Sequence, residues 1–427
     1  MKQASSQTRM RFAIQSPARK RIITAIVIAG TLLYLGLSAR LYLASFFGSR
    51  PELTSLRRAV WLDPGNADYR NHVGRYYDLV ARDQVASIEP YKAAVQLNPH
   101  SARYWFDLAG AYQVLGDTAN QSAALERAIQ ADAMTPDVAW EAANLYLVQG
   151  DNEKALREFH VVLANDTSLA NVAIQYCWRI DPDVDSLLRD VVPRTVEAYV
   201  PLLQLLESKE EVAGSIKVWN ALMATNQSFE RRYAYEYFTY LIRHKEVDEA
   251  VNAWQQTVQH FDLSSYTPTS NNLVVNSSFS LDPLNGGRDW QYQKQSGVKL
   301  TLDPTDRHSG RRSLQINFDG PGIHDAGIFQ LIPVQPNTTY QFSAYYKNGE
   351  IEGAGGPHFT VQDMYSQAVY YESDELNDAG FWKSVIGEFT TAPDAKLVVL
   401  HVRRLPEGSP IRGKLWVEDF RITKKPS

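Results

Sequence analysis

The sequence lacks several features that would point to a common enzyme class or to a disulfide scaffold. Its 427 residues include a single cysteine, Cys177, so no internal disulfide and no cysteine-based zinc site can form. No phosphate-binding loop, dinucleotide-binding glycine motif, H-E-x-x-H motif or G-x-S-x-G motif occurs. The sequence signals of these catalytic classes are therefore missing, and stability must come from burial of a hydrophobic core.

Positive charge is also scarce, except at one end of the chain. The net charge is -5, yet residues 1–21 contain six basic side chains and no acidic one. No basic surface of the kind that binds nucleic acid is indicated. With 44% hydrophobic and 21% charged residues, the composition is that of a globular protein long enough for two or three domains.

One long uncharged run is present, at residues 22–39. Its 18 residues are enough to cross a hydrocarbon layer of about 30 Å. Because the basic cluster precedes the run, the positive-inside rule puts residues 1–21 in the cytoplasm. We predict an uncleaved single-pass anchor at residues 22–43 of the cytoplasmic (inner) membrane, with the bulk of the chain on the periplasmic or extracellular side. One alternative is a signal peptide, although Leu37-Ser38-Ala39 makes a poor cleavage site. The other is a buried core helix, although no flanking sequence supplies a polar face.

Residues 51–262 show a repeat with a period near 34. The segments AVWLDPGN at 59–66, AVQLNPHS at 94–101 and AIQADAMT at 128–135 recur at steps of 35 and 34, and 211–222 matches 246–257. A two-helix motif is filled by Trp105, Leu108, Ala109 and Tyr112 in its first helix and by Ala155 and Phe159 in its second. This pattern resembles the tetratricopeptide family, which implies an α-solenoid of paired helices that binds proteins and does no chemistry.

The tetratricopeptide resemblance also implies a partner-binding groove on the first helices of the repeats. Transferring the family's groove positions gives Asn71, Arg75, Arg103, Phe106, Gln113, Trp140 and Asn144. The alternative is that these side chains are ordinary solvated or packed helix residues.

After a polar linker at residues 263–271, strand patterns replace helical ones. Short alternating stretches bounded by Gly, Pro, Asn or Asp fill residues 272–424, which predicts an antiparallel β-sandwich. The fold class is thus multidomain: a transmembrane helix, an α-solenoid and a C-terminal antiparallel β-sandwich, which the resemblance given below identifies as a jelly roll. The expected strands are LVVNSSF, VKLTL, SLQINF, YQFSAYY, HFTVQD, LVVLHV and LWVEDFRI.

The order of signals in the sandwich resembles the jelly-roll carbohydrate-binding modules of the galactose-binding-like group. The residues that carry the likeness are Asn276, Phe279, Trp290, Gln330, Trp382, Phe389 and Asp419. Relatives of this kind often hold a structural calcium ion between an acid near the opening motif and one in the last strand. Asp419 stands at the second place, but Ser280 replaces the usual acid at the first. We therefore expect no cofactor and no metal, with calcium doubtful.

Strand parity assigns the faces of the sandwich, because alternate side chains of a strand point to opposite sides. The apolar sets Tyr340, Phe342, Ala344, Tyr346, then Phe359, Val361, then Val398, Leu400, Val402 are predicted to face the core. If the three strands are neighbours, the opposite face predicts a glycan-binding patch of Tyr345, His358, His401 and Arg403. The alternative is a solvated sheet face. Secondary aromatic candidates are Tyr292, Tyr365, Tyr370 and Tyr371.

The combined prediction is a non-catalytic, membrane-anchored envelope scaffold. It would bind a protein partner through the repeats and possibly a glycan through the sandwich, in polysaccharide synthesis, export or attachment. One alternative is a purely protein-binding adaptor in which the sandwich recognises protein. A weaker alternative is a glycan-hydrolysing accessory enzyme, since acidic clusters occur at 350–352 and 372–375; we interpret these as solvated loop charges.

Overall fold

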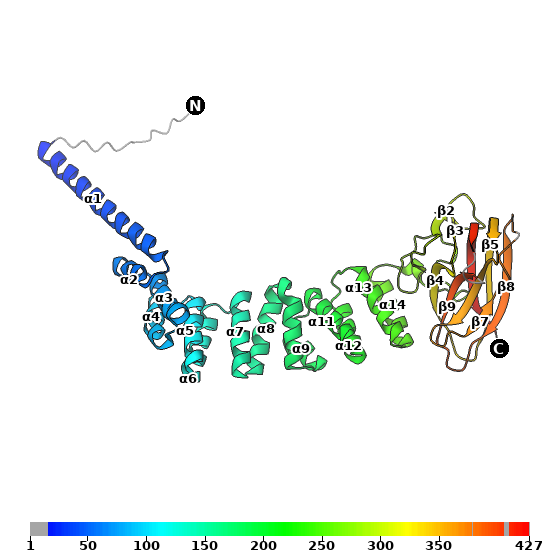
Figure 1. The fold of residues 1–427 in the computed structure, drawn as a ribbon, viewed down its shortest axis with the longest axis horizontal. Helices are drawn as coiled ribbons and strands as arrows, with labels where there is room; N and C mark the ends of the chain where they lie inside the picture. Colours follow the sequence, from blue (N-terminus) through cyan, green and yellow to red (C-terminus); the bar gives the residue numbers. More distant parts are fainter. Residues whose placement is uncertain (1–15, 378, 405–409, 427) are drawn as a thin grey trace, which may run out of the picture. The chain divides into compact units, whose positions relative to one another are not determined.

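The computed structural model describes residues 16–377, 379–404 and 410–426. The chain forms two compact units, Met1–Leu169 and Ala170–Ser427. Helices precede strands along the chain (Figure 1). The predicted fold class is confirmed: an apolar N-terminal helix, many paired helices and an antiparallel two-sheet sandwich. Residues 1–15 of the predicted cytoplasmic segment lie outside the described part.

Helix α1 (Pro17–Gly48) contains the predicted anchor. It is 32 residues long and starts with proline, whose fixed φ suits a first helical position. Among the described residues it is the one helix long and apolar enough to cross a membrane, and none of its apolar window is buried. A signal sequence passes the same test, so the anchor stays a prediction. At the other end Gly48 packs against Tyr69, where a Cβ atom would lie 2.3 Å from the ring.

The first unit continues as pairs of helices with the expected period. They are α2 (Leu53–Leu62), α3 (Ala67–Arg75) with its π-helical extension η1 (Tyr76–Ala81), α4 (Gln84–Leu97), α5 (Ala102–Leu115), α6 (Thr118–Ala131), α7 (Pro136–Gln149) and α8 (Asn152–Asn165). The small residues of the motif allow close packing: a Cβ on Gly74 would lie 2.5 Å from Tyr91, and Ala109 and Ala143 are fully buried. The prediction that this part of the chain consists of repeated pairs of helices is confirmed.

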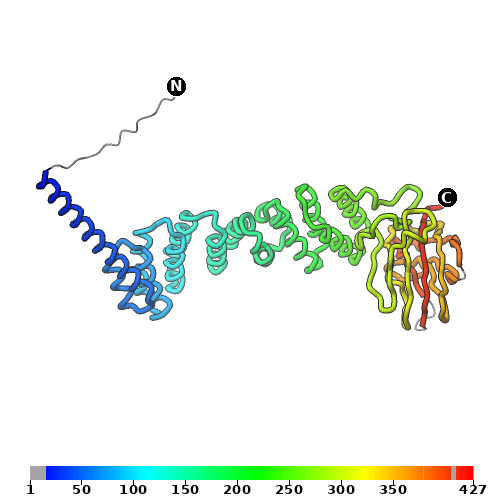
Figure 2. Tube along the Cα trace, turned by 90° about the horizontal axis from the view of Figure 1, so that it is seen from above, coloured from blue at the N-terminus to red at the C-terminus, as the bar shows by residue number. Residues whose placement is uncertain are grey.

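The second unit opens with further helices that run back and forth (Figure 2). They are α9 (Ala170–Ile180), α10 (Val184–Ser186) with η3 (Leu187–Val191), α11 (Val196–Ser208), α12 (Val212–Ala224), α13 (Arg231–Arg243) and α14 (Val247–His260). The two tryptophans with the 35-residue spacing, Trp219 in α12 and Trp254 in α14, are 2% and 1% exposed. Trp219 stacks on Tyr237 of α13 at 4.7 Å. Aromatic side chains therefore form the core of these last repeats.

The sandwich of the second unit consists of two five-stranded antiparallel sheets. One has the order β1 (Gln291–Tyr292), β4 (Asp325–Pro333), β9 (Leu397–Arg404), β6 (Pro357–Asp363), β7 (Val369–Glu372). The other has the order β2 (Val298–Asp303), β3 (Ser313–Gly320), β10 (Ile411–Lys424), β5 (Thr339–Gly353), β8 (Lys383–Thr390). We call them the β9 sheet and the β10 sheet after their central strands.

Parity correctly predicted which side chains form the core between the sheets. Phe342, Phe359 and Leu400 are all 0% exposed, and the other members of the three predicted core sets are at most 7% exposed. The stretch LVVNSSF, predicted as a strand, is instead a series of turns. The Gln330 side chain accepts from the Val275 amide (2.8 Å) and donates to its carbonyl (2.9 Å), so it replaces a neighbouring strand.

Candidate functional site: a polar cleft on the β9 sheet

The structure divides the predicted glycan patch between the two sheets. His358 lies on β6, and His401 and Arg403 lie on β9, where they share the outer face. Tyr345 lies on β5, which pairs with β10 and β8 in the other sheet. Placing Tyr345 in this patch was wrong, because β5 is not a neighbour of β6 and β9 and strand parity carries no information about strand order.

The three remaining side chains are close and fixed by hydrogen bonds. His358 stands opposite Arg403 in the β6–β9 ladder. The His401 Nδ1 lies 2.8 Å from an Asp325 carboxylate oxygen, and Arg403 donates to the Gln362 side-chain oxygen at 3.3 Å. His358 Nδ1 lies 2.7 Å from the Ser373 carbonyl, so this nitrogen carries the proton. These hydrogen bonds therefore hold the three side chains in set orientations on the outer face.

His401 has one nitrogen without a partner. Its side chain is 8% exposed, and Nε2 is buried with no hydrogen-bond partner in the described part of the chain. Because carboxylates accept, the contact with Asp325 assigns the proton of a neutral imidazole to Nδ1. Nε2 is then an acceptor, and a buried acceptor without a partner is costly unless a ligand group or water donates to it.

This nitrogen belongs to a residue that lines a cleft of about 640 Å³. The sheet side of the cleft includes Asp325, Phe329, Gln362 and His401, and Gln293 and Gln295 reach it from the loop after β1. Amide side chains both donate and accept, which matches the hydroxyl groups of a sugar, and Phe329 offers an apolar ring. We name this site the β9 cleft.

Sequence reasoning missed most of the β9 cleft. The run QYQKQ at 291–295 places glutamines at every second position, and Gln291, Gln293 and Gln295 all line the cleft. This alternation of glutamines is a signal in the sequence from which a polar face could have been predicted. The cleft also includes Thr239, Ile242 and Arg243 of helix α13, and no local pattern links a helix to a strand about 150 residues later.

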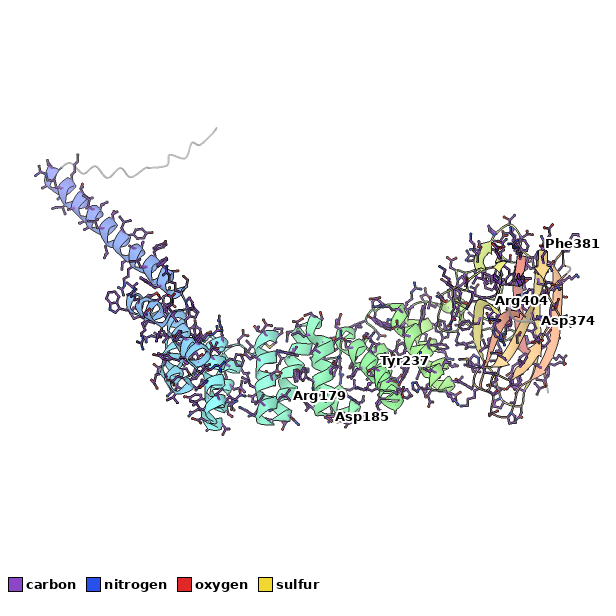
Figure 3. All side chains as sticks on the ribbon, viewed as in Figure 1. Arg179, Asp185, Tyr237, Asp374, Phe381 and Arg404 are labelled. Atoms are coloured by element: carbon purple, nitrogen blue, oxygen red, sulfur yellow. The ribbon has the colours of Figure 1, made fainter. Side chains whose placement is uncertain are left out.

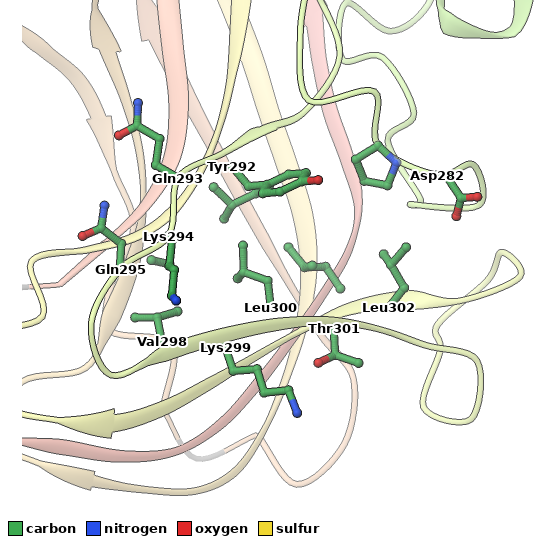
Figure 4. A pocket seen from close by; sticks show the side chains of 14 residues that line it. Asp282, Tyr292, Gln293, Lys294, Gln295, Val298, Lys299, Leu300, Thr301 and Leu302 are labelled. Carbon is green, nitrogen blue, oxygen red and sulfur yellow. The ribbon is translucent and has the colours of Figure 1, made fainter.

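A second groove of about 660 Å³ lies at the open edge of the sandwich. Tyr292 and Leu300 line its two sides, with Lys294, Lys299 and Gln293 near its rim (Figure 4). Its lining also includes Leu302, Leu314 and Ile328, so it has a mainly apolar floor. The β9 cleft also has apolar lining residues, among them Leu331, Met364 and Val399, so the feature that distinguishes it is the unpartnered Nε2 of His401.

The outer face of the β10 sheet carries Tyr345 among other rings. His308 stacks on Tyr345 with ring centres 3.7 Å apart, and Trp382 lies 5.8 Å from His308. Nearby in the chain, Phe381 is 86% exposed and projects from the sandwich (Figure 3). Of the other aromatic candidates, Tyr371 packs partly on the core, and Tyr365 donates to the Ile242 carbonyl.

The residues at the implied calcium position do not fit that ion. The buried Glu418 carboxylate accepts backbone amides of His308 (2.5 Å), Ser309 (3.0 Å) and Gly310 (2.6 Å). Asp419 accepts the Ser309 hydroxyl at 2.6 Å and contacts His308 Nδ1 at 2.7 Å. Calcium requires six to eight oxygen ligands, whereas these oxygens already accept protein donors. Across the described ranges, no three His, Cys, Asp or Glu side chains gather as a metal site.

The predicted groove of the first unit is only partly available. Asn71 is 1% exposed and donates to the Asp107 carboxylate at 2.8 Å, and Phe106 is 4% exposed. Naming these two as contact residues was wrong, because their side chains are already packed. Trp140 is half-buried with its ring edge-on to Phe159 (5.6 Å), so it also has a packing role.

The other groove positions keep some exposure. Arg103 is exposed, Arg75 and Gln113 are half-buried, and the half-buried Asn144 donates to the Trp140 carbonyl at 2.8 Å. Sequence reasoning missed Asp107, whose pKa is raised by burial despite the Asn71 hydrogen bond and the nearby Arg75. The groove therefore combines arginines with a partly desolvated carboxyl group.

The C-terminal region is thus an antiparallel two-sheet β-sandwich with a cleft on the outer face of its β9 sheet. Residues 271–406 match the sequence model of the family described as carbohydrate binding domain (CBM_4_9). No curated protein matched the chain.

Among solved structures, the chain is similar to a CBM4 module (15% identity, 36% of this chain and 99% of that one, TM-score 0.28). It is similar to the CBM22-1 xylan-binding domain of Paenibacillus barcinonensis Xyn10C (20% identity, 35% and 93%, TM-score 0.25). It is also similar to PilF of Pseudomonas aeruginosa (14% identity, 53% and 93%, TM-score 0.25).

Proposed function

We propose that this chain is a non-catalytic, membrane-anchored binding protein of the cell envelope, whose sandwich binds a glycan in the β9 cleft. The helical repeats would bind a protein partner, and the whole would act in polysaccharide synthesis, export or attachment. In this proposal residues 22–43 are the anchor, 51–262 the repeats, 263–271 the linker and 272–424 the sandwich.

The observation that carries the glycan proposal is the buried, unpartnered Nε2 of His401, a residue that lines the β9 cleft together with several glutamine side chains. A sugar hydroxyl donating to Nε2 would satisfy it, while Gln362 and Gln293 could take further hydroxyls. The family match at 271–406 supports the same ligand class, because its description is that of a carbohydrate binding domain. A binding module of this kind needs no catalytic group.

The test is calorimetric titration of the full chain in detergent with xylohexaose, cellohexaose and mannohexaose. We expect at least one to bind with a dissociation constant on the order of 10 μM to 1 mM, because few contacts must offset the ordering of a flexible sugar. His401→Ala should abolish this binding. His100→Ala, at an exposed histidine of the first unit, is the matched control and should change nothing. Absence of binding to all three sugars would favour the protein-adaptor alternative.

A further inference from the structure

We propose that helix α13 forms one wall of the glycan site and that Arg243 contacts the bound sugar. This inference rests on the proposed function and deepens it, because it makes the last helical repeat part of the ligand site. The glycan would then be held between a helix and a sheet within the second unit.

The helix presents one face to the β9 cleft. Thr239, Ile242 and Arg243 line the cleft, and their i, i+3, i+4 spacing places them on the same side of α13. The buried residues Phe238 and Leu241 of the same helix are 1% exposed. Thr239 and Arg243 are exposed, so they are free to meet a ligand that enters from solvent.

Direct contacts fix α13 and the following helix against the sandwich. Tyr365 donates to the Ile242 carbonyl at 2.9 Å. Lys245 lies over the Tyr365 ring at 5.6 Å, and Lys396 pairs with Asp248 at 2.9 Å. The hydrogen bond from Tyr365 is accepted by the residue directly before Arg243, so it sets the position of the helix end relative to the sheet.

Two glycines bring the sandwich backbone against aromatic rings of these helices. A Cβ on Gly286 would lie 2.6 Å from Tyr235 of α13, and one on Gly287 would lie 1.9 Å from Trp254 of α14. Only glycine permits such an approach. The segment that carries these glycines leads directly into β1 and the cleft glutamines. The same stretch of chain therefore makes the contact between the helices and the sandwich and also lines the cleft.

Arg243 has the chemistry needed on the helix side. Its guanidinium carries five N–H donors, whereas the sheet residues His401 and Asp325, which line the same cleft, contribute acceptors through Nε2 and the carboxylate. Sugar hydroxyls can accept from the helix side and donate to the sheet side at the same time. The composite site, formed by α13 and the β9 sheet, therefore offers both hydrogen-bond donors and hydrogen-bond acceptors to the hydroxyl groups of one oligosaccharide.

The test compares two exposed arginines that each lie in the last turn of a helix, Arg243 in α13 and Arg179 in α9 (Figure 3 labels Arg179). In titrations of the full chain with the same three hexasaccharides, Arg243→Ala should weaken binding about ten- to a hundredfold, as expected for loss of a hydrogen bond from a charged group. Arg179→Ala removes the same charge from an equivalent helix position and should leave the affinity unchanged.

A second variant keeps the inference testable if Arg243→Ala disturbs the helix. Thr239→Phe places a ring in the cleft from an exposed position, and it should block binding while the thermal midpoint stays within a few degrees of wild type. If His401→Ala abolishes binding but Arg243→Ala and Thr239→Phe both bind like wild type, the composite site is refuted while glycan binding by the sheet stands. If the wild type binds none of the sugars, both proposals fail.

Discussion

Replacing Gly287 by alanine tests the joint between the last repeat and the sandwich. The residue has a φ of +60°, and an added Cβ would lie 1.9 Å from Cζ3 of the buried Trp254. Trp254 is 1% exposed and has Phe238 edge-on at 6.0 Å, so it has little room to move. The substitution therefore adds both backbone strain and a clash.

The two effects have separate magnitudes. A left-handed backbone costs a non-glycine residue about 1 kcal/mol, and overpacking of a filled core costs about 1 to 3 kcal/mol. We expect Gly287→Ala to lower the free energy of unfolding of the second unit by about 2 to 4 kcal/mol. It should also weaken glycan binding, because it moves the wall that carries Arg243.

Gly322 provides the matched control. It has a φ of +70°, and a Cβ added there would have no atom within 4 Å, so Gly322→Ala should cost only the strain of about 1 kcal/mol. Urea unfolding followed by tryptophan fluorescence measures both variants, and titration with the hexasaccharides measures binding. Equal stability losses in the two variants, with unchanged binding, would refute the account of the joint.

Further predictions concern the core, the repeats, the anchor and pH. Burial, with a smaller contribution from Glu236, raises the pKa of Glu207 from its ordinary value of 4.5 to about 7. Between pH 4.5 and 7 the native state therefore binds more protons than the unfolded chain, so the free energy of unfolding falls as the pH rises through that window. Glu207→Gln should remove this slope in urea titrations and stabilise the protein at pH 8 by about 1 to 2 kcal/mol after allowance for solvent screening; an unchanged slope would contradict it. Phe342→Ala should lower the free energy of unfolding by about 3 to 5 kcal/mol because the side chain is fully buried, and a loss below about 1 kcal/mol in urea unfolding would be inconsistent with this core. Arg103→Ala should reduce co-purification of a partner at an unchanged melting temperature, whereas Trp140→Ala should lower the melting temperature because its ring packs on Phe159; the reverse pattern in a thermal scan would exchange their roles. Alkaline phosphatase fused after residue 270 should be active if the bulk of the chain lies outside the cytoplasm, and an inactive fusion argues against that orientation.

The elements of the fold were largely predictable because their signals are local. The repeat period located the paired helices, and strand parity identified the buried faces of three strands, as the exposures of Phe342, Phe359 and Leu400 confirm. The exception among the expected strands is the stretch at 273–279, where the Gln330 amide completes the hydrogen bonds. A side chain in that role leaves no periodic trace in the sequence.

The candidate site was less predictable because it depends on long-range order. Tyr345 was placed with His401, but β5 pairs with β10 and β8, in the sheet opposite the one that contains β9. Asn71 was assigned to a groove because its position matches the family, yet its hydrogen bond to Asp107 depends on the next repeat. The contribution of α13 to the β9 cleft depends on how a helix docks, which no pattern in 231–243 encodes.

Hydrogen–deuterium exchange on the full chain, with and without the hexasaccharide that binds best in the titration, locates the glycan site. If the sugar binds in the β9 cleft, it should slow exchange in β9 (Leu397–Arg404), in β4 (Asp325–Pro333) and at the end of α13, and leave β5 and β8 unchanged. Protection confined to the edge groove at Tyr292 and Leu300, or to the aromatic face around Tyr345 and Trp382, would contradict the β9 cleft as the glycan site.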